Sequence, residues 1–383
     1  MISKIAISGY RSLREVVIGL SDITVVTGAN GSGKSSTYRA LRLLRDVAED
    51  RIIASIAAEG GFERVLWAGP ESISRAMRSG DTPVQRTQRK GPVALKLGFE
   101  AEDVSYAIDL GLPLPDRTSM FGGDPVIKRE LLWRGRKPTA SAIIADRRGP
   151  GVTLKTKGER VQFAVDMAPY DSMVRAVAGP SAPHEIDALR RRLGAWRFYD
   201  QIRSDADSPA RRPQVGTRTL GLAPDGADLA AAVATIYEIG DASLLDTAVS
   251  NAFPGARLEV TAQSGLFQLA MHQPGMLRPL AASELSDGTL RFILLAAALA
   301  SPRPAPLLVL NEPESSLHPS VIPALASLIM EAGRDCQVLV VSHDRTLVSG
   351  LRGNGAQTVE LYKDTGETFA EGCEDLRFSW PAR

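Results

Sequence analysis

The chain has 383 residues, of which 44% are hydrophobic and 23% charged, with a formal net charge of +1. These values are typical of an ordinary globular protein with one large domain or two smaller ones. Because no apolar run approaches 18 residues, they exclude a membrane-spanning helix. The balanced charge neither favours nor excludes a nucleic-acid partner.

The N-terminus and the cysteines indicate a compartment. Residues 1–7 lack the long apolar stretch and small-residue cleavage site of a signal peptide. The two cysteines, Cys336 and Cys373, have no metal-ligand spacing. We therefore expect a reduced, cytoplasmic protein without zinc, a disulfide framework or a membrane partner.

The first part of the chain contains a phosphate-binding pattern. Short strands are predicted over 2–8 and 14–20, and a buried strand over 22–27. Residues 28–35 then read Gly-Ala-Asn-Gly-Ser-Gly-Lys-Ser, which fits the P-loop pattern G-x-x-x-x-G-K-[ST]. One helix or two follow, extending to about residue 58. Strand, glycine-rich loop and helix in this order are the context in which the pattern predicts function.

This P-loop predicts a nucleotide and magnesium site. Glycines let backbone N–H groups approach phosphate closely, and the helix N-terminus adds a positive dipole end. We expect Lys34 to reach the β- and γ-phosphates and Ser35 to ligate Mg²⁺. The alternative is a glycine-rich turn before an amphipathic helix. The predicted nucleotide contacts are Asn30, Gly31, Ser32, Gly33, Lys34, Ser35 and Ser36.

From residue 62 to 182, short alternating runs separated by Gly, Pro and Asp clusters predict an antiparallel β region. Several runs alternate, so we expect one face to meet solvent. Polar loops are predicted over 79–92 and 113–125. The predicted strands are 93–99, 104–110, 126–133, 142–146, 151–156 and 161–165.

Residues 183–256 are predicted to be mainly helical, with no heptad pattern long enough for a coiled coil. Helices are predicted over 184–193, 225–239 (with Asp as a cap) and 242–252. A basic cluster near aromatic residues suits the tracking of nucleic-acid phosphates, although a solvated helix face and loop explain it equally well. This basic cluster comprises Arg190, Arg191, Arg192, Arg197, Arg203, Arg211, Arg212 and Arg218, with Trp196, Phe198 and Tyr199.

The last part alternates strands and helices, which predicts a parallel sheet that also needs the P-loop strand. Its strands are predicted over 257–261, 266–271, 307–310 and 338–341, and its helices over 287–300, 319–331 and after Ser342.

Three short motifs lie in this last part. Glu312 follows Asn311 at the end of a buried strand, where a Walker B motif would sit, and is the candidate general base. Residues 283–288 open a helix whose N-terminus suits an anion. His343 lies just past another buried strand. The alternatives are a cluster of solvated acids, an ordinary serine cap and a structural histidine.

Taken in order, these motifs resemble the ATPase heads of the ABC superfamily. Gly28–Ser35 matches Walker A, Leu285–Gly288 the LSxG signature, Leu307–Glu312 Walker B, and His343 the switch histidine. The resemblance implies a single α/β head domain of the P-loop NTPase type. Its mixed or parallel core sheet is flanked by helices, with an antiparallel β subdomain and a small helical insertion. The implied segments are 1–61, 62–182, 183–256 and 257–383.

Within this superfamily the chain looks like the RecF/SMC branch and the OLD-like and other predicted AAA-type ATPases of bacterial defence and repair. The opening residues 5–13, the Asn-Glu-Pro-Glu run and Leu317-His318-Pro319 are similar to theirs. The chain ends soon after the switch region, so we expect no appended TOPRIM nuclease. Asn311 replaces the usual Walker B aspartate and His318 the D-loop aspartate. The Q-loop glutamine is not placed, with Gln162 and Gln201 as candidates.

The resemblance implies ATP hydrolysis to ADP and phosphate by an ATP-dependent homodimer. Ser286 and Gly288 act in trans on the γ-phosphate, Glu312 orients water and His343 contacts the γ-phosphate. Asn311 holds Mg²⁺ through water without supplying charge, so turnover is expected to be slow. By family analogy the partner is DNA. The alternatives are an effector protein encoded nearby, gated without DNA contact, and a transporter subunit; a small-molecule kinase is disfavoured.

Overall fold

The computed structural model describes residues 1–70, 77, 93–115, 118–156, 158–163, 167–180, 182–200 and 202–382. The loop predicted over 79–92 and the candidate Gln201 lie outside these residues. The chain forms two compact units. The first comprises Met1–Ser21, Gly28–Trp196 and Val359–Arg383, and the second Asp22–Thr27 and Arg197–Thr358.

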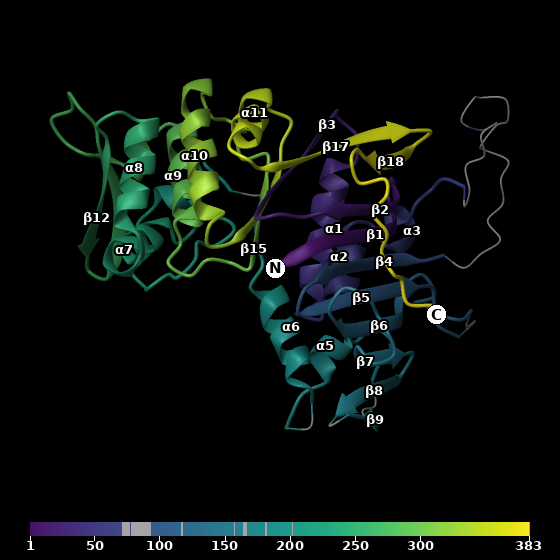
Figure 1. Cartoon of the computed structure of the whole chain (residues 1–383). Helices are drawn as coiled ribbons and strands as arrows, with labels where there is room; N and C mark the ends of the chain where they lie inside the picture. The colour runs from purple at the N-terminus through teal and green to yellow at the C-terminus, as the bar shows by residue number, and fades with distance from the viewer. Residues whose placement is uncertain are drawn as a thin grey trace. The chain divides into compact units, whose positions relative to one another are not determined.

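The first unit is built on an eight-stranded antiparallel sheet with the order β2-β1-β4-β5-β6-β7-β8-β9 (Figure 1). The predicted antiparallel region is therefore present, but it continues the sheet that the first two strands begin. Ile5 of β1 lies opposite Phe99 of β4. The strands are β1 (Ile2–Tyr10), β2 (Leu13–Gly19), β4 (Leu95–Ala101), β5 (Val104–Gly111), β6 (Val126–Arg134), β7 (Ile143–Arg148), β8 (Gly151–Thr156) and β9 (Glu159–Phe163).

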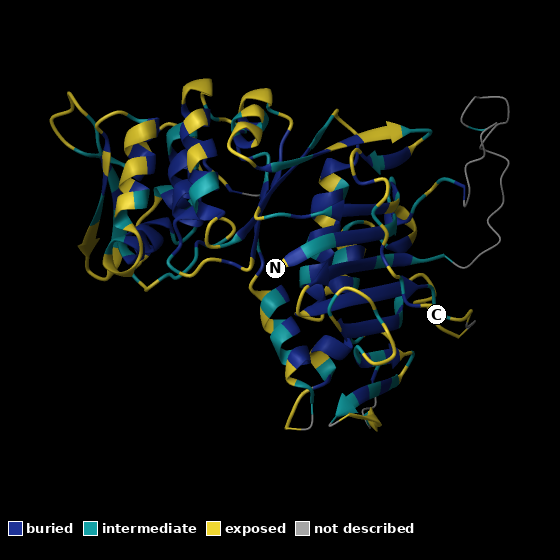
Figure 2. Ribbon diagram, viewed as in Figure 1, coloured by how far each residue is buried: buried dark blue, intermediate teal, exposed yellow. Residues whose placement is uncertain are grey.

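The middle of this sheet is buried on both faces, so the expectation of a solvent-facing side is wrong for β4 to β6. Every residue of β5 is buried (Figure 2). On one face, Phe378 of the C-terminal segment stacks edge-on against Trp133 of β6, with ring centroids 6.0 Å apart. On the other, Trp196 packs against Phe99. Alternation along a strand predicts one apolar face, and here both faces have a cover.

Short helices and a hairpin complete the first unit. The hairpin pairs β17 (Gln357–Asp364) with β18 (Glu367–Ala370), which the sequence pattern did not predict. Thr368 of β18 is tied to the β1–β2 turn, because its N–H donates to the Ser12 carbonyl at 2.9 Å. The helices are α1 (Lys34–Val47), α2 (Ile52–Ala58), α3 (Phe62–Val65), α5 (Met173–Ala176) and α6 (His184–Gly194).

The second unit contains the predicted parallel sheet. β10 (Arg197–Tyr199), β15 (Leu307–Asn311), β16 (Gln337–Val341) and β3 (Ile23–Gly28) pair in parallel in that order. All five residues of β16 and the first four of β15 are buried, as expected for parallel strands with helices packed on them.

Helices of the second unit pack on one another beside this sheet. α10 (Ile322–Ala332) contacts α8 (Ala242–Ala252), α9 (Asp287–Leu299) and α11 (Arg345–Gly353), and α7 (Leu229–Ile239) contacts α9 (Figure 1). A smaller antiparallel sheet joins β11 (Gln214–Val215), β13 (Leu266–His272), β12 (Arg257–Gln263) and β14 (Leu280–Ala281). None of the described helices combines the length and apolar character that a membrane span needs.

Candidate active site

The P-loop of the first unit has a backbone that requires glycine. Gly28, Gly31 and Gly33 have φ angles of 141°, 79° and 115°, which glycine adopts readily and other residues rarely do. A Cβ at Gly28 would lie 2.2 Å from the Leu361 carbonyl oxygen, and one at Gly33 would lie 2.7 Å from Thr368 Oγ1. The two glycines thus allow the loop to lie against the β17–β18 hairpin.

The polar groups of this loop suit a phosphate. Lys34 is buried, and its Nζ donates to the carbonyl oxygens of Gly28 and Ala29 at 2.6 and 3.0 Å. The buried Ser32 Oγ has no hydrogen-bond partner among the described residues. Ser35 is exposed in the first turn of α1. An ammonium over the loop and an unpaired hydroxyl are donors that phosphate oxygens accept from.

In the second unit, the predicted base and switch histidine lie together at the carboxyl edge of the parallel sheet. Asn311 at the end of β15 lies opposite Val341 at the end of β16. His343 Nδ1 is therefore 3.5 Å from Glu312 Oε1. β3 ends at this same edge, with Val26 opposite Val341, and the P-loop is the next segment of the chain.

A second carboxylate, missed in the sequence, belongs to this cluster. Glu314 is 9% exposed, and its Oε1 accepts from Ser342 Oγ at 2.6 Å and lies 3.9 Å from His343 Nδ1. Its only sequence signal was its place two residues after Glu312. Burial of a carboxylate is costly unless a donor or cation partners it, and Ser342 supplies such a donor. Glu314 is therefore a second acidic side chain at this edge, where Asn311 has only an amide.

The residues at this edge fit a hydrated Mg²⁺. Asn311 Oδ1 and Glu314 Oε2 are buried, and neither has a hydrogen-bond partner in the described part of the chain. Oxygen atoms without donors suit the waters that Mg²⁺ retains, because this ion prefers oxygen ligands and dehydrates reluctantly. The orphaned amide oxygen therefore suits the water-mediated role predicted for Asn311.

Glu312 has an unusual backbone that its neighbours hold. Its φ is 47°, which is rare for a residue other than glycine, and the following Pro313 restricts it further. Its N–H donates to the Val341 carbonyl at 2.8 Å, and its carbonyl accepts from Arg291 Nη2 at 3.2 Å. Burial lowers the pKa of Arg291, and the nearby carboxylates of Glu314 and Glu312 oppose that shift. Strained conformations of this kind persist where surrounding contacts fix them.

The signature motif begins a helix, as predicted. Ser286 is the N-cap of α9, and its Oγ accepts from the Thr289 N–H at 3.2 Å. Ser286 and Asp287 are exposed, so this helix N-terminus is accessible to an anion. At Gly288 a Cβ would lie 2.8 Å from the Ser316 carbonyl oxygen, so glycine allows the segment after Walker B to approach the helix.

The predicted basic cluster does not form a surface for base stacking. Its aromatic residues Trp196, Phe198 and Tyr199 are only 2%, 5% and 2% exposed, because they belong to the core. Most of its arginines have partners inside the chain. Arg190 donates to the Val174 and Val177 carbonyls, Arg191 pairs with Asp187, Arg192 with Asp103, Arg203 with Asp205, Arg211 with Asp287 and Arg218 with Glu238.

The structure also places His318, which replaces the D-loop aspartate, and Gln162, a candidate for the Q-loop glutamine. His318 caps a short 3₁₀ helix (η4, Pro319–Val321), where its Nδ1 accepts from the Ser320 N–H at 3.2 Å. Gln162 lies on β9, paired across the sheet with Thr153, at the opposite edge from β2. The P-loop lies near the other edge of that sheet, because the Ser32 carbonyl accepts from Thr368 Oγ1 of β18, which lies beside β2. Gln162 is therefore not a candidate for a nucleotide contact.

The fold and these motifs define a P-loop ATPase of the ABC type, and the comparisons agree. Residues 23–349 match the AAA_21 family, described as "AAA domain, putative AbiEii toxin, Type IV TA system". The chain therefore belongs to this family.

Two further comparisons concern repair proteins and SMC heads. The chain is 27% identical over 199 residues to the DNA replication and repair protein RecF of Pseudomonas syringae pv. syringae (strain B728a). That match covers 50% of this chain and 53% of RecF, so it spans about half the length of that relative.

Solved SMC heads share the fold over nearly the whole chain. An SMC head bound to the C-terminal winged-helix domain of ScpA has a TM-score of 0.52 at 15% identity, covering 96% of this chain and 97% of that one. An SMC head with an extended coiled coil, bound to the C-terminal domain of ScpA derived from Pyrococcus furiosus, scores 0.50 at 14% identity, covering 96% and 95%. The predicted α/β fold, with a mostly parallel sheet and an antiparallel sheet, is confirmed.

Proposed function

We propose that this protein binds Mg-ATP and hydrolyses it to ADP and phosphate. The observation that carries the proposal is the cluster of Glu312, His343 and Glu314 at the carboxyl edge of the parallel sheet, with the orphaned Asn311 oxygen beside it in the chain. Carboxylates at the end of a buried strand are what a nucleotide-hydrolysing site needs to order water and metal.

Each residue has a separate task in this proposal. Lys34 and the P-loop N–H groups bind the phosphates, and Ser35 and Asn311 hold Mg²⁺, the latter through water. When bound, Mg²⁺ neutralises charge on the phosphates. Glu312 orients the attacking water and accepts its proton. His343 contacts the γ-phosphate, and Glu314, through Ser342, keeps a negative charge beside that histidine.

We further propose that ATP drives formation of a homodimer. The exposed N-terminus of α9, with Ser286 and Gly288, is the surface that meets the γ-phosphate held by a second copy. Such a helix end supplies N–H donors that complete the phosphate cage, and the resemblance of residues 285–288 to the LSxG signature of the ABC superfamily supports this role.

The output of the dimer is a partner effector or DNA. The AAA_21 description favours an effector, and most arginines of the basic cluster pair with groups of this chain, which leaves fewer of their charges for the phosphates of DNA. The likeness to RecF, a DNA replication and repair protein, favours DNA as the second candidate.

ATP hydrolysis by wild type and by Glu312→Gln tests the proposed chemistry. A general base contributes about 10²- to 10⁴-fold, so the variant is expected to bind ATP and to turn over at least about a hundredfold more slowly. Wild-type turnover in the variant contradicts the assignment. For the partner, a duplex-DNA affinity that rises with ATP and falls steeply with salt supports DNA, and its absence supports an effector.

A further inference from the structure

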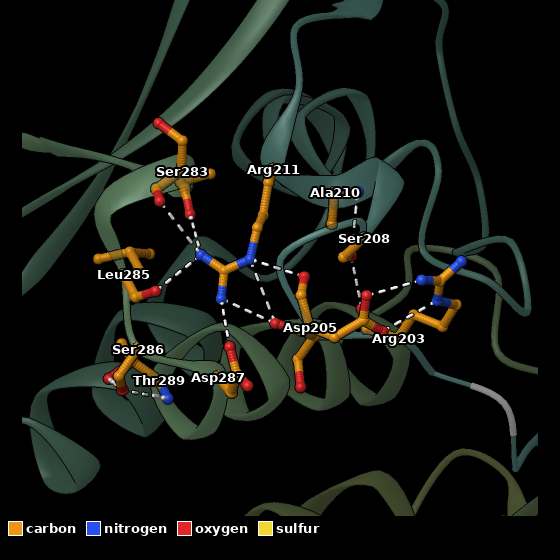
Figure 3. A network of polar contacts seen from close by, with 12 residues as sticks. Arg203, Asp205, Ser208, Ala210, Arg211, Ser283, Leu285, Ser286, Asp287 and Thr289 are labelled. Atoms are coloured by element: carbon orange, nitrogen blue, oxygen red, sulfur yellow. Dashed lines mark hydrogen bonds and ion pairs between the residues drawn. The ribbon is translucent and has the colours of Figure 1, made fainter.

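Arg211 is enclosed by carbonyl oxygens of the signature loop, which we define as residues 282–286. Its Nη1 donates to the carbonyls of Ala282, Ser283 and Leu285 at 3.1, 3.3 and 2.7 Å, and its Nη2 pairs with Asp287 Oδ1 at 2.7 Å (Figure 3). The side chain is only 9% exposed. These contacts bind both sides of Ser286, so the position of the helix N-cap depends on this guanidinium.

Arg211 is itself fixed in a folded turn of residues 202–211. Its Nε and Nη2 donate to the Ser204 and Asp205 carbonyls, at distances between 2.7 and 3.2 Å. Within the turn, Ser208 Oγ donates to the Arg203 carbonyl at 2.6 Å, and Arg203 pairs with Asp205 (Figure 3). The turn therefore presents Arg211 to the signature loop as a preorganised clamp.

Arg291 makes the reciprocal contact from the signature helix. It lies four residues after Asp287 and thus on the same face of α9. Its Nη1 donates to the Ile202 carbonyl of the turn at 3.0 Å, and its Nη2 donates to the Glu312 carbonyl at 3.2 Å. Helix α9 is thereby bound to residues 202–211 through Asp287 and Arg291, and to the Glu312 backbone through Arg291.

We propose that Arg211 and Arg291 are positioning residues that couple the signature loop to the general base of the same subunit. The proposal rests on the proposed function. Arg211 holds Ser286 where a phosphate of a second copy docks, and Arg291 transmits the position of α9 to the Glu312 backbone. A subunit that has engaged its partner through the signature loop thereby aligns its own base.

Substitutions of the two arginines are expected to change different measured quantities. Arg291→Gln should lower kcat about tenfold to a hundredfold while the KM for ATP changes less than about twofold, because a displaced base slows the reaction without touching nucleotide. Arg291→Lys should recover part of that loss, since an ammonium can donate to one carbonyl but lacks the guanidinium fork. Arg211→Gln, in the Glu312→Gln background, should raise the ATP concentration needed for dimerisation about tenfold and leave the ATP affinity of the monomer unchanged.

Arg303→Gln is the matched control, because Arg303 is an exposed arginine of the same unit. Thermal unfolding by circular dichroism shows whether a variant loses activity only because less of it is folded. In that case Arg291→Lys and Arg211→Lys, which keep the charge, are measured in place of the glutamine variants. If the wild type is active, two results overturn the coupling alone. One is that Arg291→Gln and Arg211→Gln behave as the wild type does; the other is that all variants, including Arg303→Gln, change kcat and KM to the same extent. A wild type without ATP hydrolysis, indistinguishable from Lys34→Ala, overturns the proposed function and the coupling with it.

Discussion

At the scale of single residues, Lys34 carries the proposed nucleotide binding. Its buried Nζ now donates to two loop carbonyls, and phosphate oxygens are stronger, charged acceptors for the same protons. Lys34→Ala is expected to weaken ATP binding about tenfold to a hundredfold or more, measured by calorimetry. Arg39→Ala, at an exposed position of the same helix, loses the same charge and should bind as wild type does. Equal affinity in the two variants contradicts the P-loop assignment.

Asn311 is the second test at this scale. Its buried, unpartnered Oδ1 can accept from a metal-bound water but adds no charge. Asn311→Asp is expected to lower the Mg²⁺ concentration for half-maximal ATP hydrolysis several-fold, since hard cations bind carboxylates more strongly than amides. Titration of turnover with Mg²⁺ checks this. An unchanged or higher requirement would mean that Asn311 does not face the metal.

Sequence reasoning located these residues because strand, loop and helix each have a local signature. It missed Glu314 and gave Arg211 the wrong surroundings, because their roles depend on contacts with residues far away in the chain. Arg211 donates hydrogen bonds to a loop more than 70 residues later, and Ser342, which donates to Glu314, directly follows the next strand of the sheet. Trp196, Phe198 and Tyr199 were likewise considered for a phosphate-tracking surface, and only tertiary packing places them in the core.

At the scale of elements, a buried ion pair ties β6 to β7. Arg147 and Glu130 are both fully buried, with 2.9 Å between Nη1 and Oε2, and Glu130 also accepts from Tyr106 and Ser172 at 2.6 Å each. Arg147→Met would leave the carboxylate without its cation, at an expected cost of about 3–5 kcal/mol in the free energy of unfolding.

Chemical denaturation measures that cost against a neighbouring control. Arg148 is 64% exposed and pairs with Asp146 at 3.3 Å, so Arg148→Met should cost less than about 1 kcal/mol. Similar losses for the two variants would contradict the structural role of the buried pair.

Most elements were predictable, and the failures have a common cause. Periodicity predicted most strands of the eight-stranded sheet, the strands β3, β15 and β16, and the helices over 242–252 and 287–300. In the structure these two helices begin at side-chain caps from Asp241 and Ser286. The β17–β18 hairpin and the pairing of β1 with β4 were not predicted. The whole fold determines which strands pair over long sequence separations, and local sequence patterns carry no information about that pairing.

At the scale of the whole molecule, we propose that the protein is an ATP-driven switch. Four motifs taken in order predicted the class of protein, and the AAA_21 match confirms that class. The partner was not predictable, since the aromatic residues of the basic cluster are buried and most of its arginines pair within the chain. The partner, whether an effector protein or DNA, must therefore be sought by experiment with the ATP-bound dimer.

The most direct test of the central claim is the solution mass of Glu312→Gln with and without Mg-ATP, measured by light scattering on a sizing column. We predict a monomer that becomes a dimer when ATP is added, and no such change in the double variant Lys34→Ala/Glu312→Gln. A mass that ignores ATP, whether that of a monomer or of a constitutive dimer, would contradict the claim that nucleotide drives assembly through the signature loop.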